Sequence, residues 1–259
     1  LQTMFIDTHT HLYSDSFKED RDAIIERAIN QSINQFILPA IDSTYTDSMW
    51  DLKEKYPEAM HIMAGLHPTH VDPLSVSEEL DHVKKQLVSK DLCAVGEIGV
   101  DLYWDSSTKD LQQEAFAQQI RWAKEYDLPI AIHCRDAFKE VFEVLEAEKS
   151  DKLRGVFHCF TGTIEDAHKA IGYNLKLGIG GVVTFKNGKI DQFLNEIDLE
   201  HIVLETDSPY LAPKPFRGKR NESAYLLQIA EKLSEIYQVP LAKIEETTTN
   251  NAKKLFKLD

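Results

Sequence analysis

A short apolar run recurs eight times along this 259-residue chain and limits the folds that it can adopt. The runs are "MFID" (4–7), "QFILPAI" (35–41), "HIMAGL" (61–66), "LCAVGEIG" (92–99), "PIAIHC" (129–134), "GVFHCF" (155–160), "NLKLGIGG" (174–181) and "HIVLETD" (201–207). Between them, apolar residues recur at helical spacing, as at Phe116, Ile120 and Ala123. This alternation predicts an α/β fold, a parallel (β/α)8 TIM barrel, with an open doubly wound sheet as the alternative.

The same chain contains nothing that marks a boundary between domains. No linker rich in proline or glycine, no low-complexity segment and no close internal repeat interrupts it. We therefore expect a single barrel domain over residues 1–259. Residues 1–3 precede Met4, which resembles a natural start, and are expected to be a processing or cloning remnant.

Ionisable side chains stand at or just past the C-terminal ends of the predicted strands, where barrel enzymes carry their chemistry. They are His9, His11, Glu97, His133, His158 and Asp207. A closed barrel makes its first and last strands neighbours, whereas an open sheet does so only with a particular strand order. A barrel therefore allows all six to form one site.

These residue types are the ligands of metal ions. His9 and His11 can chelate one ion, because residues two apart on a strand point to the same side. Glu97 lies in a strand too apolar to accept an unpaired carboxylate. Taken singly, His133 or His158 is more often a hydrogen-bonded core histidine than a ligand. Taken together, four imidazoles and two carboxylates suit two ions that share a bridging carboxylate.

The residues divide between two such ions in a simple way. We assign His9, His11 and Asp207 to one ion, His133 and His158 to the other, and Glu97 as the bridge. One or two divalent ions are expected, and zinc, manganese and magnesium all remain open. Water held by such ions loses a proton near neutral pH and attacks phosphorus or a carbonyl carbon, with Asp207 and Glu97 as the catalytic carboxylates. The set predicts metal-assisted hydrolysis.

The order of the motifs adds a resemblance to a known family. The segments "FIDTHTHL", "AGLHP", "VGEIGVD", "IHCRDA", "FHCFTG", "LETDSPYLAP" and "RGKRN" resemble those of the TatD-like metal-dependent deoxyribonucleases of the amidohydrolase superfamily. The resemblance covers nearly the whole chain. It implies a (β/α)8 barrel with a one- or two-metal centre and exonuclease-like hydrolysis of phosphodiester bonds in DNA. The six residues above fall on the family's metal-binding positions.

Other matched positions concern the substrate. His67 resembles a family histidine near the metal centre and is expected to contact the scissile phosphate or to assist proton transfer, although it could equally shape the turn before Pro68. The expected substrate contacts are Arg135, Arg217, Lys219 and Arg220. A surface ion pair at Arg135 and a solvated charge run at 217–220 are the structural alternatives.

Charge and composition limit the partners. The net charge of −14 argues against a broad basic surface that grips duplex nucleic acid, so DNA is expected as single strands or at ends, held locally by the metal ions. No apolar run approaches the roughly 18–20 residues of a membrane span, and the three cysteines suggest no disulfide framework. We expect a cytoplasmic protein with no membrane contact and no obligate protein partner.

Two other functions stay open at this point. An amide or ester hydrolase of the same superfamily could direct the same activated water at a small molecule. A noncatalytic scaffold would bind metal without turnover. Turnover in the presence of added metal separates these alternatives.

Overall fold

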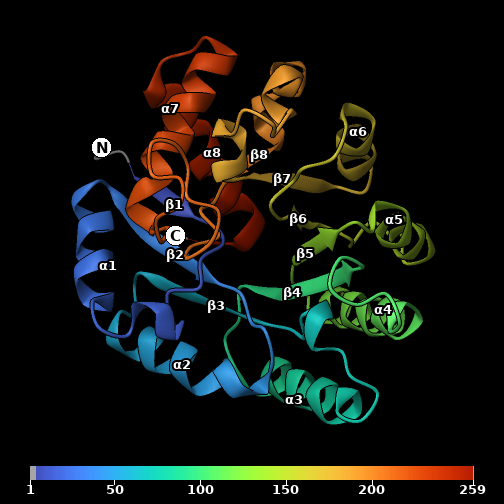
Figure 1. Ribbon diagram of the computed structural model, residues 1–259. Coiled ribbons are helices and arrows are strands. Elements are labelled where there is room, and N and C mark those ends of the chain that lie inside the picture. The colour runs from blue at the N-terminus through green and yellow to red at the C-terminus, as the bar shows by residue number, and fades with distance from the viewer. Residues whose placement is uncertain (1–3, 259) are drawn as a thin grey trace.

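In the computed structural model, which describes residues 4–258, eight parallel strands form a ring with helices outside it (Figure 1). The strands are β1 (Phe5–Asp7), β2 (Ile33–Leu38), β3 (Met60–Ala64), β4 (Ala94–Asp101), β5 (Ile130–Arg135), β6 (Gly155–Phe157), β7 (Leu175–Ile179) and β8 (Ile202–Leu204). They pair in chain order from β1 to β8. The barrel prediction is confirmed, and this order excludes a doubly wound sheet. The remnant expected at residues 1–3 lies outside the described residues.

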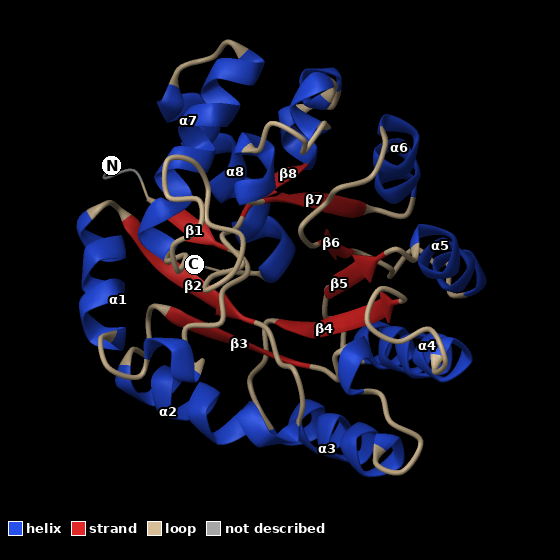
Figure 2. Ribbon diagram, viewed as in Figure 1, coloured by secondary structure: helices blue, strands red, loops and turns tan. Residues whose placement is uncertain are grey.

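Helices and short 3-10 turns connect the strands and cover the ring (Figure 2). The α-helices are α1 (Arg21–Asn30), α2 (Thr46–Lys55), α3 (Val76–Ser89), α4 (Lys109–Glu125), α5 (Phe138–Ala147), α6 (Ile164–Gly172), α7 (Leu226–Tyr237) and α8 (Leu241–Phe256). The 3-10 turns are η1 (Asp15–Phe17), η2 (Ser43–Tyr45), η3 (Pro68–His70), η4 (Gly181–Thr184), η5 (Ile190–Gln192), η6 (Leu194–Glu196), η7 (Leu199–His201) and η8 (Ser223–Tyr225). The stripe expected at Phe116, Ile120 and Ala123 is the buried face of α4. Within residues 4–258, no helix combines the length and apolar character that a bilayer span requires.

Backbone hydrogen bonds join the first strand to the last. The Thr8 amide donates to the Leu204 carbonyl over 3.0 Å, and the Asp207 amide donates to the His9 carbonyl over 2.9 Å. Residues nearly two hundred positions apart are thus held side by side. The two ends of the chain therefore contribute to the same part of the barrel.

The barrel interior has two different ends. Where the strands begin, which we call the closed end, inward-facing apolar side chains pack against α8. The members are Ile6, Ile37, Met63, Ala94, Ala131, Val156 and Val203 of the strands with Ala252, Leu255 and Phe256 of α8. The helix α8 lies against β8 and β1 (Figure 1). The opposite end, where the strands finish, we call the mouth.

The predicted strand at 201–207 is shorter than expected. β8 ends at Leu204, and Asp207 adopts a positive φ of 56°. The reason lies in Asp7, whose buried carboxylate accepts hydrogen bonds from the Thr206 amide at 2.9 Å and the Thr206 hydroxyl at 2.6 Å. These bonds draw the chain toward β1 and turn Asp207 over the mouth.

Candidate metal centre

The six ionisable residues that the sequence singles out meet at the mouth. His9 and His11 follow β1, Glu97 lies in β4, His133 lies in β5, His158 follows β6, and Asp207 follows β8. Each comes after an apolar strand segment whose burial fixes the position of the polar residue. The parallel arrangement brings these strand ends to one side of the barrel.

Glu97 lies at the middle of the cluster. Its Oε2 atom is 3.1 Å from His9 Nε2, and its Oε1 atom is 2.9 Å from His133 Nδ1 and 3.8 Å from His158 Nε2. The register between β4 and β5 shifts between Val95 and Ile98. Such irregularities redirect side chains, and here the carboxylate points into the mouth.

Gly99 allows β4 to approach β5 closely enough for this contact. Its φ is +146°, and a Cβ atom placed on it would lie 1.9 Å from the His133 carbonyl oxygen. A larger residue would therefore push the two strands apart. The short distance between Glu97 and His133 depends on this glycine.

One group of possible ligands agrees with the first ion expected from the sequence. Asp207 Oδ1 lies 3.4 Å from His11 Nε2 and 3.8 Å from His9 Nε2. Each of these three residues offers a ligand atom within 4.8 Å of the other two. His11 is oriented through its Nδ1 atom, which lies 2.8 Å from the Tyr13 hydroxyl.

The remaining ligands are grouped differently from the expected second set. His133 shares a group with Glu97 and His67, whereas His158 shares one with Glu97 and His9. The rings of His9 and His158 stack with their centroids 3.4 Å apart. Glu97 is common to both groups, as expected of a bridging carboxylate. That His133 and His158 bind the same ion stays a prediction.

His67 joins the cluster from the turn that follows β3. Its Nε2 atom lies 3.3 Å from Glu97 Oε1, and its Nδ1 atom accepts a hydrogen bond from the Thr69 amide at 3.1 Å. This histidine both caps η3 and faces the metal centre. The two interpretations of His67 from the sequence are therefore compatible.

Burial and charge shift the pKa values of the cluster in opposite directions. Burial alone would raise the pKa of Glu97, but the facing histidines, His67 and His9 foremost, hold that pKa well below its usual range. Burial would lower the pKa of His158, yet the carboxylates of Glu205 and Glu97 raise it to about 10. The mouth thus stabilises positive charge beside fixed carboxylates, which is the electrostatic requirement of a cation site.

Two buried carboxylates behind the cluster are not among the residues predicted from the sequence. Asp101 Oδ2 lies 2.8 Å from His133 Nε2, and Glu205 Oε1 lies 2.9 Å from His158 Nδ1. Carboxylates in such positions orient histidine ligands and set their tautomers. Their positions in the sequence, Glu205 two residues before Asp207 and Asp101 four residues after Glu97, are the signal that could have indicated them.

His9 provides a test of whether the residues fit a metal ion. It is fully buried; within residues 4–258 its Nδ1 atom has no hydrogen-bond partner, and its Nε2 atom lies 3.1 Å from Glu97 Oε2 without hydrogen-bond geometry. Buried polar atoms are rarely left unpaired, because each costs about 1–3 kcal/mol. A divalent cation between His9, Glu97 and Asp207 would satisfy the imidazole. The donor set of nitrogens and carboxylates fits zinc or manganese.

The expected substrate contacts lie in different settings. The Arg135 guanidinium carbon is 3.7 Å from the centroid of the Tyr103 ring. Arg217 lies 3.7 Å over Phe185, which lines a cleft of about 770 Å³ between the loops that follow β6 and β7. Arg220 is already engaged, because it binds the Asp20 carboxylate through two bonds of 2.6 and 2.9 Å. Lys219 has no carboxylate partner within the described residues.

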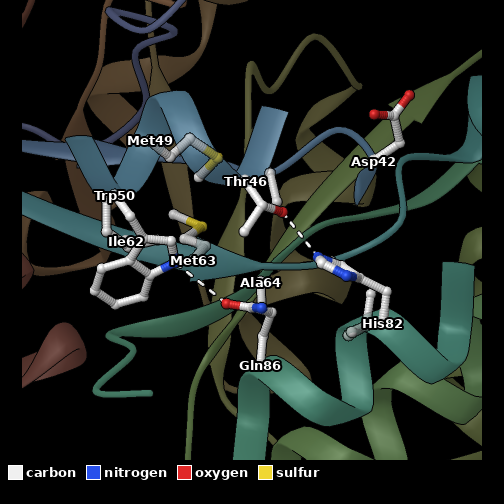
Figure 3. A pocket seen from close by; sticks show the side chains of 12 residues that line it. Asp42, Thr46, Met49, Trp50, Ile62, Met63, Ala64, His82 and Gln86 are labelled. Atoms are coloured by element: carbon white, nitrogen blue, oxygen red, sulfur yellow. Dashed lines mark hydrogen bonds between the residues drawn. The ribbon is translucent and has the colours of Figure 1, made fainter. Parts of the chain in front are cut away.

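A second pocket lies away from the mouth, between α2, α3 and β3. Figure 3 shows two pairs among its polar side chains: Thr46 Oγ1 lies 2.8 Å from His82 Nε2, and Trp50 donates to Gln86 over 3.2 Å. Its volume is about 10 Å³, which is roughly the room of one water. This pocket is packing between helices.

Comparisons with known proteins agree with this geometry. A family model described as TatD related DNase matches residues 6–257. The chain is 38% identical over 258 residues to the metal-dependent hydrolase YabD of Bacillus subtilis, and the alignment covers 99% of this chain and 100% of YabD. It is 30% identical over 256 residues to a protein of Escherichia fergusonii named 3′-5′ ssDNA/RNA exonuclease TatD, and the alignment covers 96% of this chain and 98% of that protein. The crystal structure of YjjV, a TatD homologue from Escherichia coli, matches with a TM-score of 0.89 at 29% identity over 98% of both chains.

Proposed function

The chain belongs to the TatD family of metal-dependent hydrolases, and on that premise we propose that it cleaves phosphodiester bonds of DNA, in single strands or at ends. One or two divalent ions would be held by His9, His11, Glu97, His133, His158 and Asp207. Zinc, manganese and magnesium remain candidates.

The observation that carries the proposal is the unsatisfied imidazole of His9 beside two carboxylates. Glu97 and Asp207 lie 3.1 and 3.8 Å from its Nε2 atom, and both stay ionised because neighbouring histidines hold their pKa values low against the effect of burial. When bound, a divalent ion at such a site polarises a phosphoryl oxygen and lowers the pKa of a water. The same six residues would form its ligand shell.

His67 would supply a hydrogen-bond donor beside the substrate. Burial lowers its pKa to about 4, so the ring is neutral at pH 7. Its Nδ1 atom accepts from the Thr69 amide, which leaves the ring proton on Nε2, the atom that faces Glu97. From there His67 would donate a hydrogen bond to an oxygen of the scissile phosphate and stabilise the negative charge on it.

Nucleic acid is favoured over other phosphoesters by one relative and by the surroundings of the mouth. The protein of Escherichia fergusonii, 30% identical to this chain, carries the name of an exonuclease for single-stranded DNA and RNA. Positive charge is placed at the end of β5 by Arg135 and on the loop after β8 by Arg217 and Lys219. These cations would contact phosphates that flank the scissile bond.

The test is metal-dependent cleavage of DNA. The protein is stripped with a chelator, restored with magnesium, manganese or zinc, and incubated with end-labelled single- and double-stranded DNA. Asp207→Asn should abolish the activity. Asp110→Asn, at a carboxylate whose side chain is 88% exposed on α4, should not change it.

The products identify the reaction. A metal-restored ladder on single-stranded DNA, absent in Asp207→Asn and present in Asp110→Asn, supports the proposal and gives the polarity of cleavage. Intact DNA with every metal overturns it. Release of p-nitrophenol from a small phosphodiester under the same conditions would then assign the site to a smaller substrate.

A further inference from the structure

We propose that Tyr103, Trp104 and Arg135, which we call the platform, bind an unpaired nucleobase of the strand being cleaved. The proposal rests on the proposed function and specifies how that substrate is held. The base stacks on the Trp104 ring, and Arg135 contacts the adjoining phosphate. The consequence is a preference for unpaired strands, because a paired base is already stacked within its duplex.

The platform is an exposed aromatic surface with a cation at its centre. Trp104 is 69% exposed and Tyr103 is 54% exposed. Their rings are perpendicular, with centroids 5.0 Å apart, and the Arg135 guanidinium carbon lies 3.7 Å from the Tyr103 centroid and 5.5 Å from the Trp104 centroid. The cation–π contact fixes the arginine without neutralising its charge. Aromatic rings beside arginine are the standard stacking surface for single-stranded nucleic acid.

Asp101 connects the platform to the metal centre. Its Oδ1 atom accepts hydrogen bonds from the Tyr103 amide at 3.0 Å and the Trp104 amide at 3.1 Å, while its Oδ2 atom lies 2.8 Å from His133 Nε2. A single buried carboxylate thus positions both the loop after β4 and a candidate metal ligand. Movement of the platform relative to the metal centre is restricted.

The strand register places the platform one step outward from the ligands. Arg135 and His133 are two residues apart on β5, so both side chains point to the same side of the strand, roughly 7 Å apart along it. Asp101 pairs with Arg135, and Gly99 pairs with His133. A base on the platform would therefore belong to a nucleotide next to the scissile phosphate.

Nucleic acid fits this surface better than an acidic or purely apolar partner. Trp104 is exposed, whereas the other two tryptophans, Trp50 and Trp122, are only partly exposed. A base supplies the flat apolar face, and the adjoining phosphate supplies the anion for Arg135. Both requirements are met by one nucleotide.

The kinetic test compares a normal oligonucleotide with one that carries abasic sites next to the cleaved bond. For Trp104→Ala, we expect KM on the normal single strand to rise roughly 5- to 100-fold with kcat within about two-fold, as for loss of one stacked base. On the abasic strand, wild type and Trp104→Ala should have equal KM values. Leu74→Ala, at a side chain that is 95% exposed before α3, is the control and should change neither. An equal effect of Trp104→Ala on both strands, or no effect, overturns the proposal.

A binding measurement separates this proposal from the proposed function. Metal-stripped wild type is titrated with oligothymidine and with an abasic strand of the same length, and tryptophan fluorescence is followed. Quenching by oligothymidine but not by the abasic strand supports the platform, even if no DNA is cleaved. This quenching should be lost in Trp104→Phe, because that variant keeps an aromatic ring but lacks the fluorescent indole. Absence of quenching in a protein that does cleave DNA overturns the platform and leaves the proposed function intact.

Discussion

At the closed end of the barrel, Leu255 and Phe256 of α8 pack against inward-facing apolar side chains such as Ile6 and Val203. At the mouth, a few residues further along the same strands, the interior is filled by imidazoles and carboxylates, and His9 lacks hydrogen-bond partners within the described residues. The closed end is complete as the chain folds. The mouth is completed only by a ligand, so the two ends should respond differently to substitution.

The largest effect is expected at the mouth. Glu97→Gln removes the charge that four histidines surround, and we expect kcat/KM to fall by on the order of 10³-fold or more. Metal binding should also weaken. In the wild-type protein, added manganese or zinc should raise Tm, because a ligand of the native state stabilises it. The variant should lose most of that rise.

The control for Glu97→Gln is Glu143→Gln, at an exposed carboxylate of α5. It should retain both activity and the metal-dependent rise in Tm. Full activity in Glu97→Gln would contradict the expectation that the mouth is the catalytic end of the barrel.

The closed end should show the opposite response. Phe256→Ala removes a buried ring between α8 and the strands, and we expect the free energy of unfolding to fall by about 3–5 kcal/mol. Activity per folded molecule should stay within about two-fold, because distant sites act independently. Urea unfolding and single-turnover cleavage measure the two quantities. A large loss of activity in fully folded Phe256→Ala would show that the two ends are coupled.

The sequence predicts the barrel and the members of the cluster for a common physical reason. Candidate ligands stand in or just after five of the eight apolar runs, and parallel strands bring their C-terminal ends together. His9, Glu97 and Asp207 could therefore be placed near one another before the structure was known. Their proximity follows from topology alone.

Finer features depend on packing that periodicity does not encode. The grouping of His133 with His67 follows from the register shift in β4 and from Gly99. The pairing of Arg220 with Asp20 joins residues two hundred positions apart. The sequence does not predict the position of Glu205 behind His158, because that position depends on the space that Gly178 leaves in β7.

An effect of intermediate size on metal affinity is expected for Glu205, the carboxylate behind the candidate ligand His158. Glu205 Oε1 accepts a hydrogen bond from the Cys159 amide at 2.6 Å and lies 2.9 Å from His158 Nδ1. Glu205→Gln should lower metal affinity by about 10- to 100-fold, which is typical when the carboxylate behind a histidine ligand is lost. Isothermal titration with manganese or zinc measures it.

Gly178→Ala tests the position of the Glu205 carboxylate by filling the space beside it. A Cβ atom on Gly178 would lie 2.3 Å from Glu205 Oε2, so the carboxylate must move and metal affinity should fall as well. Glu200→Gln, at an exposed carboxylate of η7, is the matched control. Unchanged metal affinity in Glu205→Gln would mean that His158 is oriented without this residue.

The smallest effect concerns His61, the titratable ring at the closed end. His61 pairs in register with Ile37, and its buried Nε2 atom has no hydrogen-bond partner within the described residues. Burial, reinforced by the charge of Lys53, lowers the pKa of this histidine to about 4. The unfolded chain takes up the proton at about 6.5. The stability that neutral His61 contributes is therefore complete above pH 6.5 and is lost as pH falls toward 4.

We expect this residue to account for on the order of 1–2 kcal/mol of the decrease in stability between pH 7.5 and pH 4.5, discounted for its partial exposure. Urea unfolding at the two pH values, in chelator, should show a smaller decrease for His61→Gln than for wild type. The histidines of the mouth titrate in both proteins and cancel in the difference. His168→Gln, on the exposed side of α6, should behave as wild type. An equal decrease in wild type and His61→Gln would assign the acid sensitivity to the mouth, and the closed end would then be insensitive to pH as well as to metal.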